Sequence, residues 1–180
     1  MTKKNTSADA LRSILVKGVG AATVQEVAQK AAQHQPDYDA LVMLSCDAQM
    51  HTRMKASWAM AKATELNSAS AGKHLPLLFE RIRTETTQGV LRELYKTLAA
   101  CTIPAKYEGA YIDISFGMLQ NAETDLAVKH HAKLALMKYV KQYPELKSEL
   151  MEALQRVINA HTEPWRVQVL KTLAKLEKMK

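Results

Sequence analysis

Basic residues recur at a fixed interval along this chain. On a helix, the positions four and seven residues after a given residue lie on the same face. Several of these positions after the recurring cations are also basic, so the basic residues form a stripe along one helix face. No acidic residue interrupts this stripe, so it could hold phosphate groups or an acidic protein segment. The recurring cations, spaced 37 residues apart, are Lys55, Arg92, Lys129 and Arg166, and the added ones are Lys62, Lys96 and Lys133.

Other residues capable of chemistry do not form a recognisable site. His130 and His131 are adjacent and point about 100° apart on a helix, so they cannot chelate one ion as an i, i+4 pair could. Asp47 and His51 have that spacing but straddle a predicted helix start, where a capping aspartate and a solvated histidine explain them. The sequence contains no HExxH, CxxC pair, GxSxG, P-loop or GxGxxG motif. We therefore expect no catalytic residue, no metal ligand and no cofactor.

Composition indicates one soluble helical protein. The 180 residues are 47% hydrophobic and 24% charged, with a net charge of +7 that permits an anionic partner without demanding one. No apolar run approaches the roughly 18–20 residues that span a bilayer, and the first residues, MTKKNTS, lack the apolar stretch of a signal peptide. We expect a cytoplasmic protein with no membrane partner. Cys46 and Cys101 are expected to be reduced, packed thiols.

The helices that must position the basic stripe follow from apolar periodicity. Leu75, Leu78, Phe79 and Ile82, for example, have the i, i+3, i+4, i+7 spacing of an amphipathic helix. No segment alternates as a strand would, and a period of 37 residues is typical of stacked two-helix repeats. Ser7 and Thr23 are predicted to cap the first two helices. We predict one all-α domain over residues 1–180, divided into a disordered tail at 1–6, N-terminal cap helices at 7–35, and helix pairs at 36–66, 74–102, 105–143 and 144–179.

The stretch AVKHHAKLALMKYV resembles the HEAT repeat, with Val128-Lys129, Ala132 and Ala135-Leu136 carrying the match. This resemblance implies a right-handed α–α superhelix, a HEAT-like solenoid of about four helix pairs, whose second helices line a concave face. MKASWAMA, IPAKYEGAYIDISFGML and KQYPELKSEL are similar to a group of short bacterial HEAT-like helical proteins, over roughly Thr23 to Lys180. Some members of that group carry an adenylosuccinate-lyase label, although the GSSxMPxKxN signature loop of that superfamily is absent from this sequence.

The resemblance implies a non-enzymatic binding or scaffold module that engages a protein partner through its concave face. The alternative is a nucleic-acid-binding protein that uses the basic stripe as a groove. HEAT-like alkylpurine DNA glycosylases couple an aspartate with tryptophans in such a groove. Here Trp58 and Trp165 fall at apolar positions of the repeat, and Asp113 falls on a first helix, so we find no matching constellation. A lyase-labelled enzyme is the remote alternative.

A purely structural role for the basic stripe also stays open. In HEAT-like proteins the recurring basic residue commonly bonds to an acidic residue of a neighbouring repeat. The positions six residues before the recurring cations are Gln49, Thr86, Glu123 and Ala160, and only one of these is acidic.

Overall fold

Every regular element of the described chain is a helix. The computed structural model describes residues 6–18, 20–159 and 161–179, and in these ranges it contains no strand. The all-α prediction is therefore confirmed. Of the predicted disordered tail, residues 1–5 lie outside the described residues, and Thr6 already belongs to the first helix.

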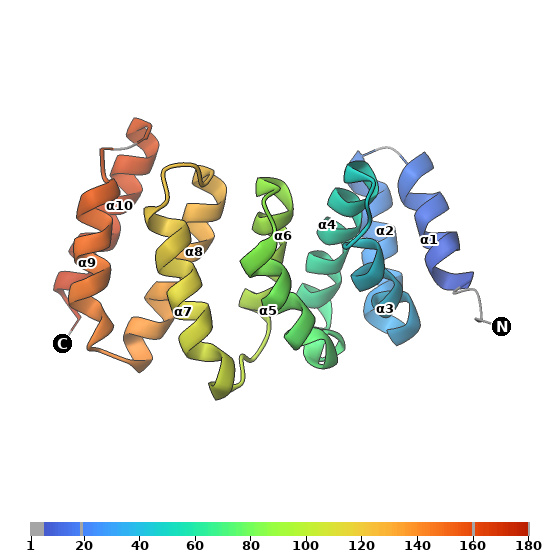
Figure 1. Ribbon diagram of the computed structural model, residues 1–180, viewed down its shortest axis with the longest axis horizontal. Coiled ribbons are helices and arrows are strands. Elements are labelled where there is room, and N and C mark those ends of the chain that lie inside the picture. The colour runs from blue at the N-terminus through green and yellow to red at the C-terminus, as the bar shows by residue number, and fades with distance from the viewer. Residues whose placement is uncertain (1–5, 19, 160, 180) are drawn as a thin grey trace. The chain divides into compact units, whose positions relative to one another are not determined.

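The chain forms two compact units, Met1–Ile103 and Pro104–Lys180. In unit 1, α2, α4 and α6 pack in sequence and α1 packs against α3, as Figure 1 shows. The predicted N-terminal cap is thus itself a helix pair, stacked like those that follow. The elements of unit 1 are α1 (Thr6–Lys17), α2 (Gly20–Gln33), α3 (Gln35–Leu44), α4 (Met50–Leu66), the 3₁₀ helix η1 (Ser68–His74), α5 (Leu75–Thr84) and α6 (Gln88–Ala100).

Three local expectations in unit 1 were wrong. Thr23 does not cap α2, because the helix begins three residues earlier at Gly20, whose φ of +80° suits a residue without a side chain. Ser7 lies inside α1, and its hydroxyl hydrogen-bonds the carboxylate of the buried Asp37 instead of capping the helix. Residues 67–73, which the predicted pairs 36–66 and 74–102 left outside any helix, are largely the 3₁₀ helix η1.

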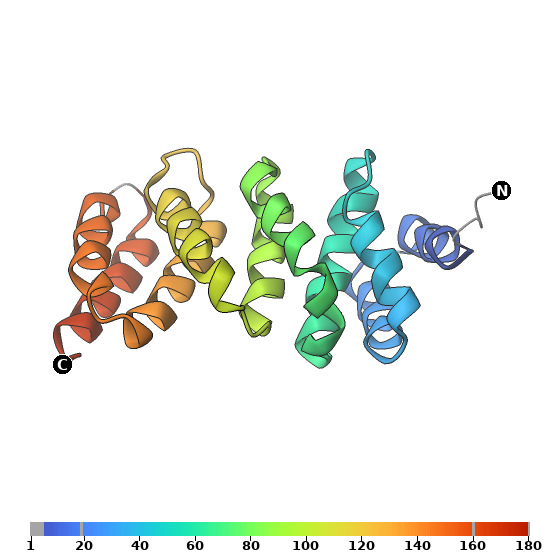
Figure 2. The same ribbon diagram turned by 60° about the horizontal axis from the view of Figure 1, so that its bottom comes forward.

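Unit 2 contains two helix pairs in two layers. Its helices are α7 (Ala105–Gln120), α8 (Leu126–Gln142), α9 (Leu146–Val157) and α10 (Glu163–Glu177). Contacts join α7 to α9, α7 to α8 and α9 to α10, so α7 and α9 form one layer and α8 and α10 the other, as Figures 1 and 2 show.

The two prolines of unit 2 differ in position. Pro164 lies in the first turn of α10, where its missing N–H costs no helical hydrogen bond. The predicted helix pair 144–179 places Pro144 at the start of its first helix, but α9 begins only at Leu146. A turn separates the helices, in which the backbone N–H groups of Leu146 and Lys147 donate to the carbonyls of Tyr143 and Pro144.

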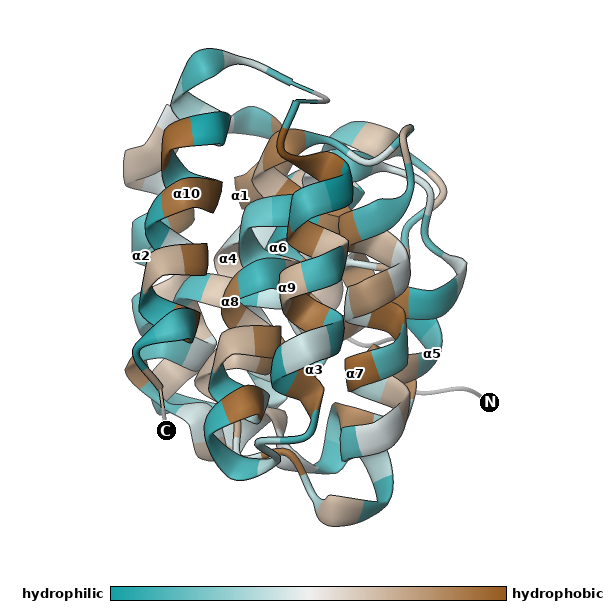
Figure 3. Ribbon diagram, turned by 90° about the vertical axis from the view of Figure 1, so that its left-hand side faces the viewer, coloured by the Kyte–Doolittle hydropathy of each residue, from teal (hydrophilic) through white to brown (hydrophobic). Residues whose placement is uncertain are grey.

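Apolar side chains meet between the helices of unit 2. Phe116 and Leu119 of α7 share a core with Leu136 of α8 and with Trp165 and Val169 of α10. Trp165 was expected to pack in the core, and it is buried. In Figure 3, hydrophobic and hydrophilic segments alternate along α9 and α10, as the amphipathic spacing of a surface helix requires.

Candidate functional site

The seven predicted binding residues divide between the two units. Lys55 and Lys62 lie on α4, Arg92 and Lys96 on α6, Lys129 and Lys133 on α8, and Arg166 on α10. Each pair lies on one second helix, as the spacing predicted. Their surroundings nevertheless differ from one helix to the next, and these differences separate structural cations from candidate binding residues.

Lys55 holds the end of α1. Its ammonium donates to the carbonyl oxygens of Leu15 at 2.8 Å and Gly18 at 2.7 Å. Because the last carbonyls of a helix lack partners within the helix, a cation at this position both satisfies them and complements the helix dipole. Lys55 therefore has a structural role. Lys62, two turns further along α4, is partly exposed and has no ion pair with the described residues of either unit.

Arg92 and Lys96 neutralise a buried carboxylate. Glu93 is only 2% exposed, and it accepts hydrogen bonds from Arg92 Nε at 2.9 Å and from Lys96 Nζ at 2.8 Å. The sequence did not indicate this pairing, because Glu93 lies directly after Arg92 and adjacent residues on a helix do not face each other. The long arginine side chain nevertheless contacts it. Two of the predicted binding cations are thus already paired.

Lys129 and Lys133 occupy successive turns of α8 and are buried. Their side chains are 1% and 2% exposed, and no carboxylate in the described parts of the chain forms an ion pair with either. Burial lowers the pKa of both ammonium groups. The Lys133 ammonium lies 5.6 Å from the centroid of the Trp165 ring, within the range of a cation–π contact.

Two histidines lie beside these lysines. Burial and then the charge of Lys133 lower the pKa of His130, and burial and then the charge of Lys129 lower the pKa of His161. His161 packs edge-on against Trp165, and its Nε2 atom is buried with no hydrogen-bond partner in the described structure. We call Lys129, Lys133, His161 and Trp165 the α8–α10 cluster. This cluster contains no acidic side chain.

The rest of the second-helix layer of unit 2 is also basic. α8 carries four lysines, including the exposed Lys138 and Lys141, and no acidic residue. On α10, Lys171 and Lys175 are exposed, and the two acids lie at the helix ends. Arg166 is exposed and lies 3.7 Å from the carboxylate of Glu163 in the first turn. In the other layer, α7 and α9 together contain four acidic and three basic residues.

Large apolar side chains are exposed among these lysines. Leu134 of α8 is 50% exposed, Leu170 of α10 is 46% exposed, and Val167 is also exposed. Leu134, Lys138 and Lys141 have the i, i+4, i+7 spacing of one face of α8. We call these exposed residues of α8 and α10 the second-helix surface of unit 2: Leu134, Lys138, Lys141, Val167, Leu170, Lys171 and Lys175.

The 37-residue recurrence pointed to the buried lysines but not to the exposed ones. Lys138, Lys141 and Lys171 lie outside the i, i+4, i+7 stripe counted from the recurring cation. Comparing the charges of first and second helices, rather than following one column, would have found them.

The remaining predicted features give no catalytic or metal centre. Within the described residues, no group of three or more histidine, cysteine, aspartate or glutamate side chains could hold a metal ion. Cys101 is buried, whereas Cys46, also expected to be packed, is exposed and accepts a contact from Arg81. Asp113 is exposed on α7.

Comparison with known proteins gives one match. A family model described as HEAT repeat domain matches residues 11–173. No curated protein matches the chain. No solved structure matches it either. Among the helices of the described ranges, none is both long enough and apolar enough to cross a membrane.

Proposed function

The chain belongs to the HEAT repeat domain family, and we propose that it is a non-enzymatic binding module whose second-helix surface in unit 2 binds an acidic segment of a protein partner. Helical-repeat scaffolds of this family generally mediate protein interactions and are typically non-enzymatic. The single observation that carries the proposal is the pair of buried lysines, Lys129 and Lys133, that no carboxylate of the described chain neutralises.

A buried ammonium group is costly because it loses its hydration. The cost is several kcal/mol for each ion, to order of magnitude, unless an opposite charge or hydrogen bonds compensate for it. Two other cations of the stripe are compensated, Lys55 by two carbonyls and Arg92 by Glu93. A carboxylate brought by a partner would compensate Lys129 and Lys133 in the same way, so the free energy of binding would include the relief of this cost.

The exposed lysines supply the long-range part of the attraction. Lys138 and Lys141 on α8 and Lys171 on α10 belong to the same two helices as the cluster, and no acid on α8 opposes their positive charge. Such a surface increases the rate of association with an acidic partner, and the effect falls as salt rises. In the proposed complex Lys129 and Lys133 extend their ammonium groups on flexible aliphatic stems to meet the bound carboxylate.

The apolar residues favour a protein over a nucleic acid. Leu134, Val167 and Leu170 offer aliphatic contacts to an amphipathic protein segment. Single-stranded nucleic acids are instead bound by exposed aromatic rings on which bases stack. The aromatic residues of these helices, Tyr139 and Trp165, are buried in the core. The acidic partner segment is therefore expected to carry leucine-like side chains as well.

The test is a titration of the full chain with an acidic peptide of glutamate and leucine in amphipathic helical spacing. We expect measurable binding that weakens at least tenfold between about 50 and 200 mM salt, because several ionic contacts are broken. Lys138→Glu and Lys171→Glu should each weaken binding by roughly tenfold, which corresponds to about 1.4 kcal/mol. The matched control is Lys106→Glu on α7, which changes the net charge equally but lies in the other layer.

Two results would overturn the proposal. One is equal weakening by Lys138→Glu and Lys106→Glu, which would reduce the effect to net charge. The other is tighter binding of duplex or single-stranded DNA than of the peptide at the same salt, with the same dependence on Lys138 and Lys171. That outcome would assign the surface to nucleic acid.

A further inference from the structure

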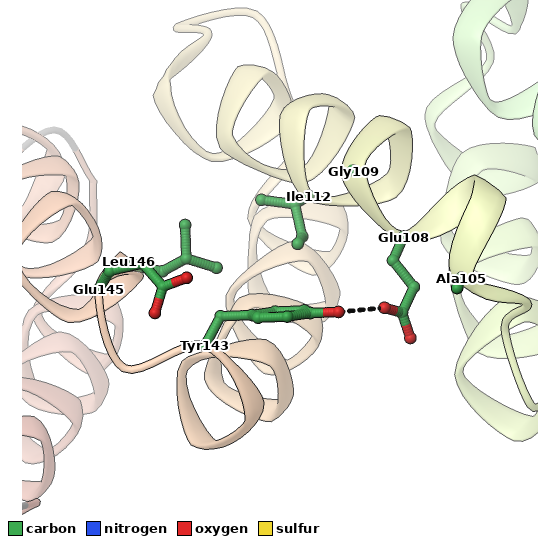
Figure 4. Close-up of a pocket in the computed structure, with 7 residues that line it drawn as sticks. All are labelled: Ala105, Glu108, Gly109, Ile112, Tyr143, Glu145 and Leu146. Carbon is green, nitrogen blue, oxygen red and sulfur yellow. Dashed lines mark hydrogen bonds between the residues drawn. The ribbon is translucent and has the colours of Figure 1, made fainter.

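A small cavity with two acidic residues in its lining lies away from the basic second-helix surface in unit 2. Its volume is about 300 Å³, at the lower end of the range for ligand pockets. Figure 4 shows that its walls come from the first turns of α7 and from the connection between α8 and α9. The lining residues are Ala105, Glu108, Gly109 and Ile112 from α7, and Tyr143, Glu145 and Leu146 from the connection and the start of α9.

A tyrosine fixes the first carboxylate of this cavity. The hydroxyl of Tyr143 donates to Glu108 Oε2 at 2.6 Å, and the side-chain amide of Gln142 donates to the same oxygen at 3.2 Å. The hydrogen bond to Glu108 raises the pKa of Tyr143, so the hydroxyl keeps its proton and remains a donor at neutral pH. A carboxylate has about four lone-pair positions, and Glu108 therefore retains capacity for a further donor.

The second carboxylate, Glu145, lies at the opposite end of the tyrosine ring from Glu108 in Figure 4. Its charge contributes to the raised pKa of Tyr143. Neither carboxylate has an ion pair with a lysine or arginine among the described residues, although the chain is rich in both. The cavity therefore has two carboxylates, one hydrogen-bonded and one exposed, with no lysine or arginine of the described chain at ion-pair distance.

The wall between the carboxylates is apolar. Figure 4 places Ile112 and Leu146 on the same side of the Tyr143 ring. Aliphatic side chains beside an aromatic ring accept a short alkyl chain, and the ring face also attracts a cation. An ammonium group on an aliphatic stem complements both the carboxylates, through its positive charge, and the apolar wall, through its stem.

We propose that this cavity binds an alkylammonium group, with the stem against Ile112, Leu146 and the Tyr143 ring and the ammonium at Glu108 or Glu145. The group is either a lysine side chain of a protein segment or a free diamine. The site differs from the second-helix surface in residues and in charge, so it stands or falls independently of the proposed function.

The experiment is an NMR titration of the ¹⁵N-labelled full chain with 1-aminopentane at neutral pH and low salt. An alkylamine is protonated there, since the pKa of a lysine-like ammonium is about 10.4. We expect saturable shifts of the Gly109, Ile112 and Leu146 amides. Binding should weaken by about tenfold in Glu108→Gln, which keeps an acceptor for Tyr143 but removes the charge, and in Glu145→Gln. The matched control, Glu123→Gln, removes an exposed charge of unit 2 outside the cavity and should leave the affinity unchanged.

The uncharged analogue 1-pentanol tests whether charge matters. Equal affinity for 1-pentanol, no saturable shifts at the three amides, or undiminished affinity in the Glu108→Gln/Glu145→Gln double variant would overturn the proposal. If Glu108→Gln fails to fold by circular dichroism, Glu145→Gln alone decides, because Glu145 is exposed. Comparison of Nα-acetyl-lysine amide with 1,5-diaminopentane then separates the two sources, since the tighter ligand identifies which one the cavity accommodates. Binding of the acidic peptide should be unchanged in both variants.

Discussion

Replacing Lys129 by methionine should stabilise the protein. The side chain is 1% exposed, burial lowers the pKa of its ammonium, and no carboxylate of the described chain pairs with it, so the charge is partly dehydrated. Methionine has a similar length and volume but no charge. Replacing a buried ion pair by apolar residues of similar volume is often neutral or stabilises by about 1–4 kcal/mol, and for a single unpaired ion we expect about 1–2 kcal/mol. At roughly 2–4 °C for each kcal/mol in a chain of this size, the melting temperature should rise by about 2–8 °C.

The pH dependence of the free energy of unfolding tests the cost of the Lys129 charge independently. Burial lowers the pKa of Lys129 in the folded state below its unfolded value. Between these two values the unfolded state binds more protons, so the free energy of unfolding rises with pH and the cost of the charge disappears above about 10.5. The folded-state pKa of Tyr139 is raised to about 12, mainly by burial, and it acts in the opposite direction above pH 10. In the range between the lowered folded-state pKa and the unfolded value, measured below the pH at which Tyr139 acts, the wild-type stability should therefore rise more steeply with pH than that of Lys129→Met.

The assay is urea and thermal unfolding of the full chain followed by circular dichroism. Lys138→Met is the matched control, because Lys138 lies on the same helix but is exposed, and its replacement should change stability by less than about 0.5 kcal/mol. A destabilised Lys129→Met, or one that behaves like the control, would mean that the folded protein already compensates this ammonium. The argument for an external acidic partner would then lose its main support. A stabilised variant that binds the acidic peptide less tightly would instead show stability given up for binding.

Three further changes test other contacts. Glu93→Gln should destabilise the chain by about 1–3 kcal/mol in urea unfolding, because it removes the buried charge that two cations of α6 share; an unchanged midpoint would contradict the pairing. Lys55→Met should lose about 1–2 kcal/mol and should speed hydrogen exchange of the last amides of α1 more than those of α2, because the carbonyls at the end of α1 lose their donor. For Asp39, burial alone would raise the pKa, but hydrogen bonds from Lys73 and other donors outweigh it and lower the pKa to about 2. The stability that Asp39 contributes is therefore present above its unfolded pKa of 3.8 and is lost as pH falls through about 2. Asp39→Asn should make the stability less dependent on pH over that range.

The fold was accessible from the sequence because its determinants are local and repeated. The apolar spacing of Leu75, Leu78, Phe79 and Ile82 defines one face of a helix, and all four side chains are buried in α5. Helix ends were harder to predict. Threonine is a residue type that often caps helices, which is why Thr23 was predicted as a cap. The start of α2 is instead set by the positive φ of Gly20, and such a backbone conformation cannot be recognised from residue types alone.

The candidate site was only partly predictable, because it depends on what each cation meets in three dimensions. The sequence placed Lys55, Arg92 and Lys129 at equivalent positions. In the structure the first meets helix-end carbonyls, the second a neighbouring glutamate, and the third a buried site without a carboxylate in the described chain. The cavity beside Tyr143 also escaped prediction, because Glu108 and Tyr143 lie 35 positions apart and meet only through the packing of α7 and α8.

Mapping the acidic peptide on the ¹⁵N-labelled chain by NMR tests the central claim most directly. The account predicts chemical-shift changes along the exposed sides of α8 and α10, at Leu134, Lys138, Leu170 and Lys171, with α7 and α9 nearly unaffected. Changes confined to α7 and α9, changes confined to unit 1, or no saturable changes at low salt would contradict it.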